Sequence, residues 1–218
     1  MRSSPQRRRA KIIENNECES AVISQSPDTN IPFHSHIMSK ASYAEDISCR
    51  RKGVFFSMRE KPYNRQAAVA YARKWALKRN PRYYDFQDIG GDCTNFVSQC
   101  LFAGAGVMNF TPTFGWYYLS LSDRAPAWTG VVYLYHFLTT NRSVGPYARE
   151  VSPDEIEQGD IIQLGNSNGT FYHSLMVTAV TPDILVCTHT YDALDAPLSS
   201  YLFDQARFLH IEGVRAWN

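Results

Sequence analysis

The sequence lacks long apolar segments and lacks an excess of charge of either sign. None of its 218 residues falls in a run that approaches the roughly 18 consecutive apolar residues of a membrane-spanning helix. Its 22 basic and 21 acidic side chains leave a formal net charge of +1. Because binding to nucleic acid or to an anionic surface usually draws on a marked positive excess, the sequence predicts neither partner and no membrane span.

A secretory leader and a disulfide framework are also missing from the sequence. No apolar segment follows the basic N-terminus, MRSSPQRRRAKIIENNECES, so we expect no leader and, by default, a cytoplasmic protein. The five cysteines are an odd number at irregular spacing. A chain of this length can bury a core without disulfides, which favours a reducing compartment with free thiols. No cofactor is expected, and a monomer is the default state.

The composition changes near residue 58. The segment 1–58 is rich in Ser, Asn, Arg and Glu and has little hydrophobic periodicity, which predicts a largely disordered tail. Its basic patch QRRRAK fits a solvated tail better than a site for nucleic acid or a targeting signal. Residues 59–218 are expected to form one domain.

The domain is predicted to place helices before strands. Asn64 can cap a helix that runs to about Arg79, and Asn80–Pro81 ends it. The other elements indicated by periodicity and turn residues are helices at about 93–104 and 131–139, and strands at 160–164, 171–180 and 184–191. Helices followed by antiparallel strands predict an α+β fold.

The stretch GGDCTNFVSQC puts Cys93 in the first turn of the expected 93–104 helix. Unpaired backbone N–H groups and the positive end of the helix dipole stabilise a thiolate there, and the same N–H groups can bind an oxyanion. Gly90 and Gly91 allow a sharp turn and leave room for a substrate. This position predicts a nucleophile. The competing interpretation is a small buried hydrophobic residue, as most free cysteines are.

A nucleophilic cysteine needs a base, normally a histidine that a third polar group holds. His173 and His189 lie on the last two expected strands. A three-residue turn at Thr181–Asp183 would pair His189 with Leu175, and His173 would then be a diagonal neighbour on the same face. A two-residue turn would put the two rings on opposite faces. Asp192 is the alternative third residue.

These features together resemble the putative amidase domain family, found largely in bacterial proteins, a branch of the papain-like NlpC/P60 and CHAP group of cysteine peptidases and amidases. The resembling segments span about residues 63–200 and are YNRQAAVAYARKWA, NPRYYDF, GGDCTNFVSQCLFAGA, WTGVVYLYHFL, EQGDIIQL, YHSLMVT and THTYDALDAPLS. The resemblance implies a papain-like fold, with N-terminal helices packed on a small antiparallel sheet. It also implies Cys93 as nucleophile and His173 as base, while His189 fits the third position by its order.

The implied activity is hydrolysis of an amide or peptide bond through a thioacyl-enzyme, on cell-wall or other peptide-like substrates. Acyl transfer by the same thiol and a catalytically inactive binding module are the alternatives within this fold. A zinc site is a further alternative, although the sequence has no CxxC or HxxxH pair. Its ligands would be Cys93, His173, His189 and Cys187. The candidate residues of the substrate cleft are Asp92, Trp116 and Trp128.

Overall fold

A seven-stranded antiparallel sheet organises residues 57–218, the part of the chain that the computed structural model describes. The strand order is β1-β7-β3-β4-β5-β6, and β2 also pairs with β7. The strands are β1 (Met58–Lys61), β2 (Gly145–Val151), β3 (Ile161–Gly165), β4 (Phe171–Ala179), β5 (Leu185–Thr188), β6 (Ala193–Pro197) and β7 (Gln205–Trp217). The predicted disordered tail lies, except for residues 57 and 58, outside the described residues.

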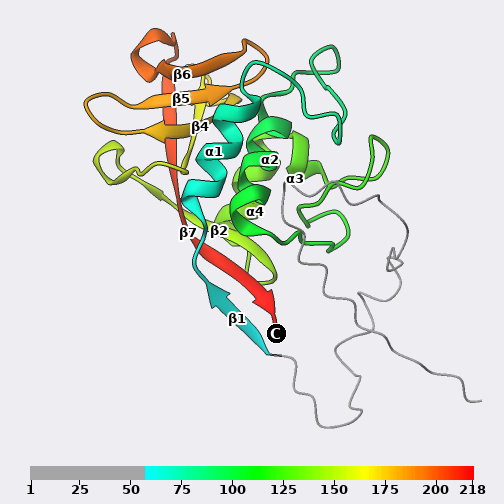
Figure 1. The fold of residues 1–218 in the computed structure, drawn as a ribbon. Coiled ribbons are helices and arrows are strands. Elements are labelled where there is room, and N and C mark those ends of the chain that lie inside the picture. The colour runs from blue at the N-terminus through cyan, green and yellow to red at the C-terminus, as the bar shows by residue number, and fades with distance from the viewer. Residues whose placement is uncertain (1–56) are drawn as a thin grey trace, which may run out of the picture.

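Helices cover one face of this sheet, so the fold is α+β as predicted (Figure 1). They are α1 (Arg65–Trp75), α2 (Cys93–Ala105), the single-turn α3 (Pro126–Thr129) and α4 (Val131–Thr140), with short 3₁₀ turns η1 (Pro153–Glu155) and η2 (Leu198–Ser200) elsewhere. Within residues 57–218 no helix combines the length and the apolar character needed to cross a membrane.

Local signals explain where the first two helices begin and end. The Asn64 side chain accepts a hydrogen bond from the Ala67 amide at 3.0 Å, which confirms the predicted N-cap. Helix α2 begins at Cys93, as predicted, and ends at Gly106, whose φ of 68° is readily adopted by glycine. Helix α1 stops at Trp75, a few residues before the predicted end.

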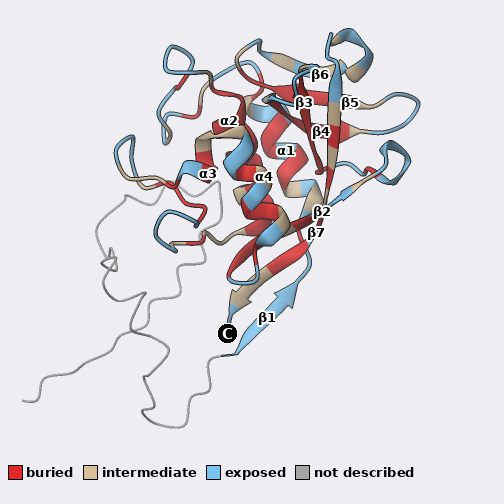
Figure 2. Ribbon diagram, turned by 180° about the vertical axis from the view of Figure 1, so that it is seen from behind, coloured by how far each residue is buried: buried red, intermediate tan, exposed pale blue. Residues whose placement is uncertain are grey.

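Helix α2 is buried all around, whereas its sequence indicated a single apolar stripe (Figure 2). Residues that face away from the sheet are covered by the aromatic segment between α2 and α4. The indole of Trp116 donates to the Ser98 hydroxyl at 3.0 Å, and that of Trp128 donates to the Asn95 side chain at 2.9 Å. These hydrogen bonds allow polar residues of α2 to be buried at low cost.

A separate apolar cluster packs on each face of the sheet. The helix-covered face holds the larger apolar cluster, in which Ile161 and Met176 meet residues of α2 such as Val97. The opposite face holds a smaller cluster that includes Ile162, Leu175 and residues next to η2. Since side chains alternate along a strand, Ser174 faces the helices and His173 faces away from them.

A bulge in the β4–β5 pair changes the predicted register. The pair Ala179 and Leu185 agrees with the three-residue turn, but a bulge follows and pairs Val177 with Val186. Beyond the bulge, His189 is level with Ser174 rather than with Leu175. The two histidines therefore lie on opposite faces of the sheet, and the predicted juxtaposition of the rings is wrong.

Candidate active site

The Cys93 thiol lies in the first turn of α2, at the end of β4. Its sulfur is 3.8 Å from the Thr94 hydroxyl, and it also receives hydrogen bonds from the Ser174 backbone amide and the Thr190 hydroxyl. Only 6% of the residue is exposed. Burial raises the pKa of Cys93 above its usual value, because the loss of solvation outweighs these hydrogen bonds. The thiolate expected from the helix dipole is thus not the favoured form in this state.

His173 begins the buried part of β4, directly before Ser174. Its Nε2 is 3.5 Å from the Thr188 hydroxyl, which donates to the Ser174 and His189 carbonyl oxygens at 2.9 and 3.1 Å. The hydroxyl proton is used on the carbonyls, so the oxygen accepts from Nε2–H and Nδ1 keeps its lone pair. Burial lowers the pKa of His173 to about 4, which keeps the ring neutral at neutral pH.

His189 pairs with Asp92 and not with His173. Its Nδ1 is 2.5 Å from Asp92 Oδ2, and its Nε2 is 2.9 Å from the Trp75 carbonyl oxygen. The ring also packs on Phe96, with centroids 4.1 Å apart. Both polar partners are acceptors, so both contacts are satisfied when each ring nitrogen carries a proton.

Asp92 is fully buried and does not line a cleft, contrary to the sequence prediction. Besides His189, its carboxylate accepts from the Phe86 amide at 2.9 Å and from the Asn95 side chain at 2.8 Å. Although Asp92 holds the N-cap position, its side chain makes no capping hydrogen bond to α2. The carboxylate therefore fixes the residue before Cys93 and leaves the first amides of the helix uncapped.

The backbone around Cys93 takes unusual conformations. Gly90 and Gly91 have φ angles of 89° and 96°, which explains the glycine pair in the sequence. Thr190, a β-branched residue, has a φ of 83° and accepts from the Asp92 amide at 2.9 Å. Strain of this kind is typical of functional sites. Here it holds the Thr190 hydroxyl beside the thiol.

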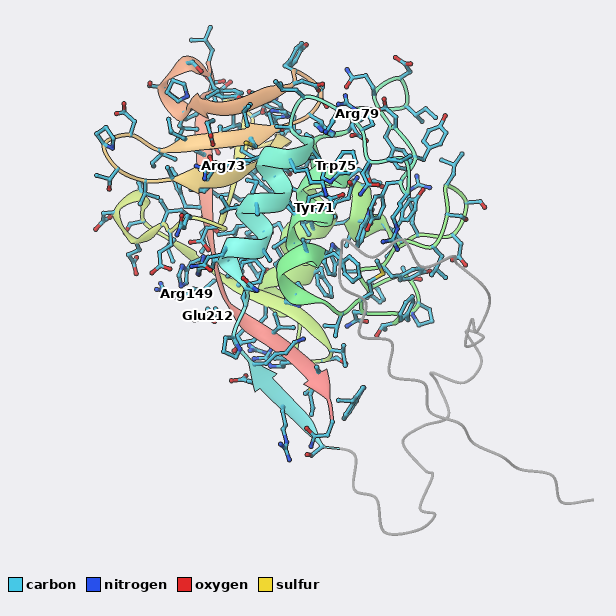
Figure 3. All side chains as sticks on the ribbon, viewed as in Figure 1. Tyr71, Arg73, Trp75, Arg79, Arg149 and Glu212 are labelled. Carbon is cyan, nitrogen blue, oxygen red and sulfur yellow. The ribbon has the colours of Figure 1, made fainter. Side chains whose placement is uncertain are left out.

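The other predicted site residues do not join the thiol. Trp116 and Trp128 are fully buried and pack on each other with tilted rings, 4.9 Å between centroids, so they belong to the core rather than to a cleft. Asp192 forms an ion pair with Arg79, at 2.8 Å. Figure 3 labels Arg79 near the end of α1, close to Trp75.

The ligands of the alternative zinc site do not converge. His173 and His189 face opposite sides of the sheet, and the Cys187 sulfur contacts the Asp195 backbone amide at 3.4 Å. Among residues 57–218 no group of three or more His, Cys, Asp or Glu side chains is arranged to hold a metal ion.

A row of polar side chains that sequence reasoning missed crosses the sheet beneath the starts of α2 and α4. The Thr94 and Ser174 hydroxyls are 3.0 Å apart, and Gln163 Nε2 donates to the Ser174 hydroxyl at 3.2 Å and to the Val131 carbonyl at 2.9 Å. The Gln163 oxygen accepts from Arg207 at 2.8 and 2.5 Å. The serine of YHSLMVT was the only visible signal of this row, because the other members come from distant strands.

Two curated relatives come from Bacillus subtilis strain 168, and both are described as uncharacterized. YhbB is 35% identical over 136 residues, which is 60% of this chain and 42% of YhbB. YjcM is 54% identical over 44 residues, which is 20% of this chain and 10% of YjcM. The alignments thus span less than half of either relative. No solved structure matches the chain.

A match to a family model identifies the family of the chain. Residues 62–211 match the putative amidase domain, so the match includes α1, α2, β4 and most of β7. It includes the thiol and both histidines described above. Because it covers well over half of the chain, the protein belongs to the putative amidase domain family, whose description points to amide hydrolysis in general.

Proposed function

We propose that the protein is a cysteine-dependent hydrolase of amide bonds in peptide-like substrates, with Cys93 as nucleophile and His173 as general base. The observation that carries the proposal is the contact of the thiol with the Ser174 amide, next to His173 in β4. Family membership supports amide hydrolysis. A helix that starts at the thiol and precedes the strand of the base is also consistent with the predicted papain-like relationship.

The Cys93 sulfur is hydrogen-bonded to the backbone amide of Ser174, so it lies at the edge of β4, and we infer that the His173 ring reaches it around this edge from the other face of the sheet. In the acylation step, Nδ1 of His173 accepts the Cys93 proton while the sulfur attacks the carbonyl carbon of the amide. Both groups start neutral, because burial raises the pKa of the thiol and lowers that of the imidazole to about 4. The proton therefore moves together with the attack, not before it. The carbonyl oxygen becomes an oxyanion that the uncapped amides at the start of α2 can bind.

The tetrahedral intermediate then collapses. The His173 imidazolium donates its proton to the leaving amine, and Cys93 retains the acyl group as a thioester. In the second half of the reaction, His173 accepts a proton from water as the water oxygen attacks the thioester carbonyl. Collapse of this second intermediate expels the sulfur, which takes the proton back, and releases a carboxylic acid.

The third position of the site is proposed to be Thr188 rather than His189 or Asp192. The Thr188 hydroxyl, 3.5 Å from Nε2 of His173, favours the tautomer with a free lone pair on Nδ1. In this proposal the Asp92–His189 pair has a positioning role, since it fixes the turn that presents Cys93.

Labelling and hydrolysis by matched variants test this proposal. We expect iodoacetamide to label Cys93 well before Cys100 and Cys187, both fully buried, and His173→Ala to slow the reaction at Cys93. On a panel of peptide amides, His173→Ala should lower kcat/KM by about 10²–10⁴-fold, the usual contribution of general base catalysis. Cys93→Ala should abolish hydrolysis.

The control is Cys187→Ala, which removes a buried thiol outside the proposed site and should leave both readouts unchanged. Addition of an amine acceptor such as hydroxylamine separates hydrolysis from acyl transfer, because a transferase would form the hydroxamate in preference to the acid. If Cys93→Ala hydrolyses amides as well as the unaltered protein, the mechanism is wrong. If Cys93 labels no faster than Cys187, an inactive binding module is the better description.

A further inference from the structure

Arg207 is a buried cation held flat between two aromatic rings. Its guanidinium carbon lies 3.7 Å from the centre of the Tyr135 ring and 3.9 Å from that of Phe171. Nε and Nη2 donate to the same oxygen of Gln163. Only 9% of the residue is exposed. The two faces and one edge of the guanidinium are thus occupied by the protein.

No carboxylate of residues 57–218 forms an ion pair with Arg207, whereas Arg65, Arg79 and Arg215 each pair with at least one. Glu150 is the carboxylate whose charge acts on Arg207, but it accepts a hydrogen bond from the Tyr135 hydroxyl, at 3.0 Å, and not from the guanidinium. Burial lowers the pKa of Arg207, which reflects the loss of solvation by its charge. A buried cation without an anion is costly, and such groups are normally paired.

The position of Arg207 relative to the thiol follows from the sheet register. Arg207 in β7 pairs with Gln163 in β3, and Gln163 pairs with Ser174 in β4. Arg207 is therefore two strand spacings, about 10 Å, from the strand position whose amide contacts the Cys93 sulfur. An extended peptide advances at most about 3.5 Å per residue, so two residues together with an acidic side chain span that distance.

A surface cavity that could hold part of a ligand lies at the start of α4. Gln163 donates to the carbonyl of Val131, the first residue of α4. The preceding residue, Gly130, lines a surface cavity of about 350 Å³ together with Arg124 and Tyr133.

We propose that the free edge of Arg207, formed by Nη1 and Nη2, binds a carboxylate of the substrate, and that the protein therefore prefers amides with an acidic side chain about two residues from the scissile bond. This edge has no acceptor among the described residues, and its two parallel N–H groups match a carboxylate. The aromatic rings and Gln163 hold the fork in one orientation. The inference rests on Cys93 being the reactive thiol of the site.

The test uses pairs of alkylating reagents, and the two members of a pair differ only in the charge at the end far from the reactive carbon. Iodoacetylglycine, iodoacetyl-β-alanine and iodoacetyl-γ-aminobutyrate carry a carboxylate at increasing distance from the carbon that reacts with sulfur. Each is compared with its carboxamide at physiological ionic strength, which screens weak surface attraction. Mass spectrometry gives the alkylation rate of Cys93 for each pair of reagents.

We expect Cys93 to react about tenfold faster with at least one carboxylate than with its carboxamide, as for one charged hydrogen-bonded contact. Arg207→Gln should abolish the preference, and Arg207→Lys, which keeps the charge without the fork, should reduce it. Arg149→Gln is the matched control, because it removes the same charge from an exposed residue of β2, beside Glu212 of β7, and should change nothing (Figure 3).

Thermal unfolding of each variant confirms that it is folded, and the reagent series on the unaltered protein decides the matter even if Arg207→Gln fails to fold. Ready labelling of Cys93 by iodoacetamide without a carboxylate preference at any length would overturn the inference and leave the proposed hydrolase intact. A preference that survives in Arg207→Gln would also overturn it. If iodoacetamide does not single out Cys93, the proposed function fails first and the inference fails with it.

Discussion

Two aspartate–histidine pairs with buried carboxylates lie at opposite ends of α1 and differ in what they hold in place. The Asp92–His189 pair lies next to the thiol, with 2.5 Å between the polar atoms. The Asp160–His210 pair lies at the start of β3, at 2.8 Å, and Asp160 also accepts from Arg65 at 2.6 Å. Both carboxylates are fully buried.

The difference lies in what each pair connects, because both carboxylates also lie near an arginine. Asp160 accepts from Arg65 and so ties the start of α1 to β7. Asp92, which has Arg79 Nε at 3.5 Å, binds a histidine whose second nitrogen contacts the Trp75 carbonyl, and its own backbone leads directly into Cys93. The same pair of residue types therefore serves general stability at one end and the position of a candidate nucleophile at the other.

Among the substitutions that test this comparison, removal of either carboxylate should have the largest effect on stability. Asp92→Ala and Asp160→Ala each leave buried donors without an acceptor, so each should lower the free energy of unfolding by about 3–5 kcal/mol. Only Asp92→Ala should also slow alkylation of Cys93, measured at a temperature at which both variants are folded. Equal slowing in both variants would mean that the Asp92–His189 pair has no special link to the thiol.

The other buried histidine, His173, has no carboxylate partner among residues 57–218 and should respond to acid. Its pKa is about 4 in the folded protein because of burial, against about 6.5 in an unfolded chain, so the unfolded state binds the proton first as the pH falls. Stability is therefore fully present above pH 6.5 and is lost between pH 6.5 and pH 4, by about 3 kcal/mol. Denaturant unfolding at several pH values measures this loss.

The control for this prediction is His173→Gln, which cannot titrate. Its stability should fall less over the same pH range, and the difference between the two curves isolates the histidine. Parallel curves would show that His173 is not the buried neutral group described above.

Substitution of the two glycines before Asp92 should have the smallest effect on stability, and it tests whether the local backbone positions Cys93. Gly90→Ala and Gly91→Ala both force a side chain to a positive φ, which costs about 1–2 kcal/mol of folding free energy. A Cβ at Gly90 meets nothing within 4 Å, but one at Gly91 would be 3.0 Å from the Thr190 hydroxyl oxygen. Only Gly91→Ala should therefore also change the alkylation rate of Cys93, and identical rates in both variants would contradict this.

Sequence reasoning located the parts of the site that depend on local signals. The Asn64 cap, the start of α2 at Cys93 and the strand that carries His173 each follow from residues a few positions apart. Their physical causes, side-chain capping and hydrophobic periodicity, act within one turn or one strand. The structure agrees with all three.

The parts that sequence reasoning missed depend on contacts between distant segments. A single bulge in β4 moved His189 to the face opposite His173, and no residue type near Thr178 marked it in advance. The Asp92–His189 contact joins residues 97 positions apart. Arg207 went unnoticed because β7 packs on both sides, so its sequence does not show the simple alternation of a half-exposed strand.

The place of β7 in the sheet has a consequence for how the protein is made. This strand comes last along the chain, yet it pairs with β1, β2 and β3 and carries Arg207. During synthesis, the thiol and both histidines leave the ribosome before the strand that completes the sheet beneath them. A nascent chain without β7 therefore lacks the strand that joins β1, β2 and β3, and under the proposed function its site would be complete only once this strand has emerged.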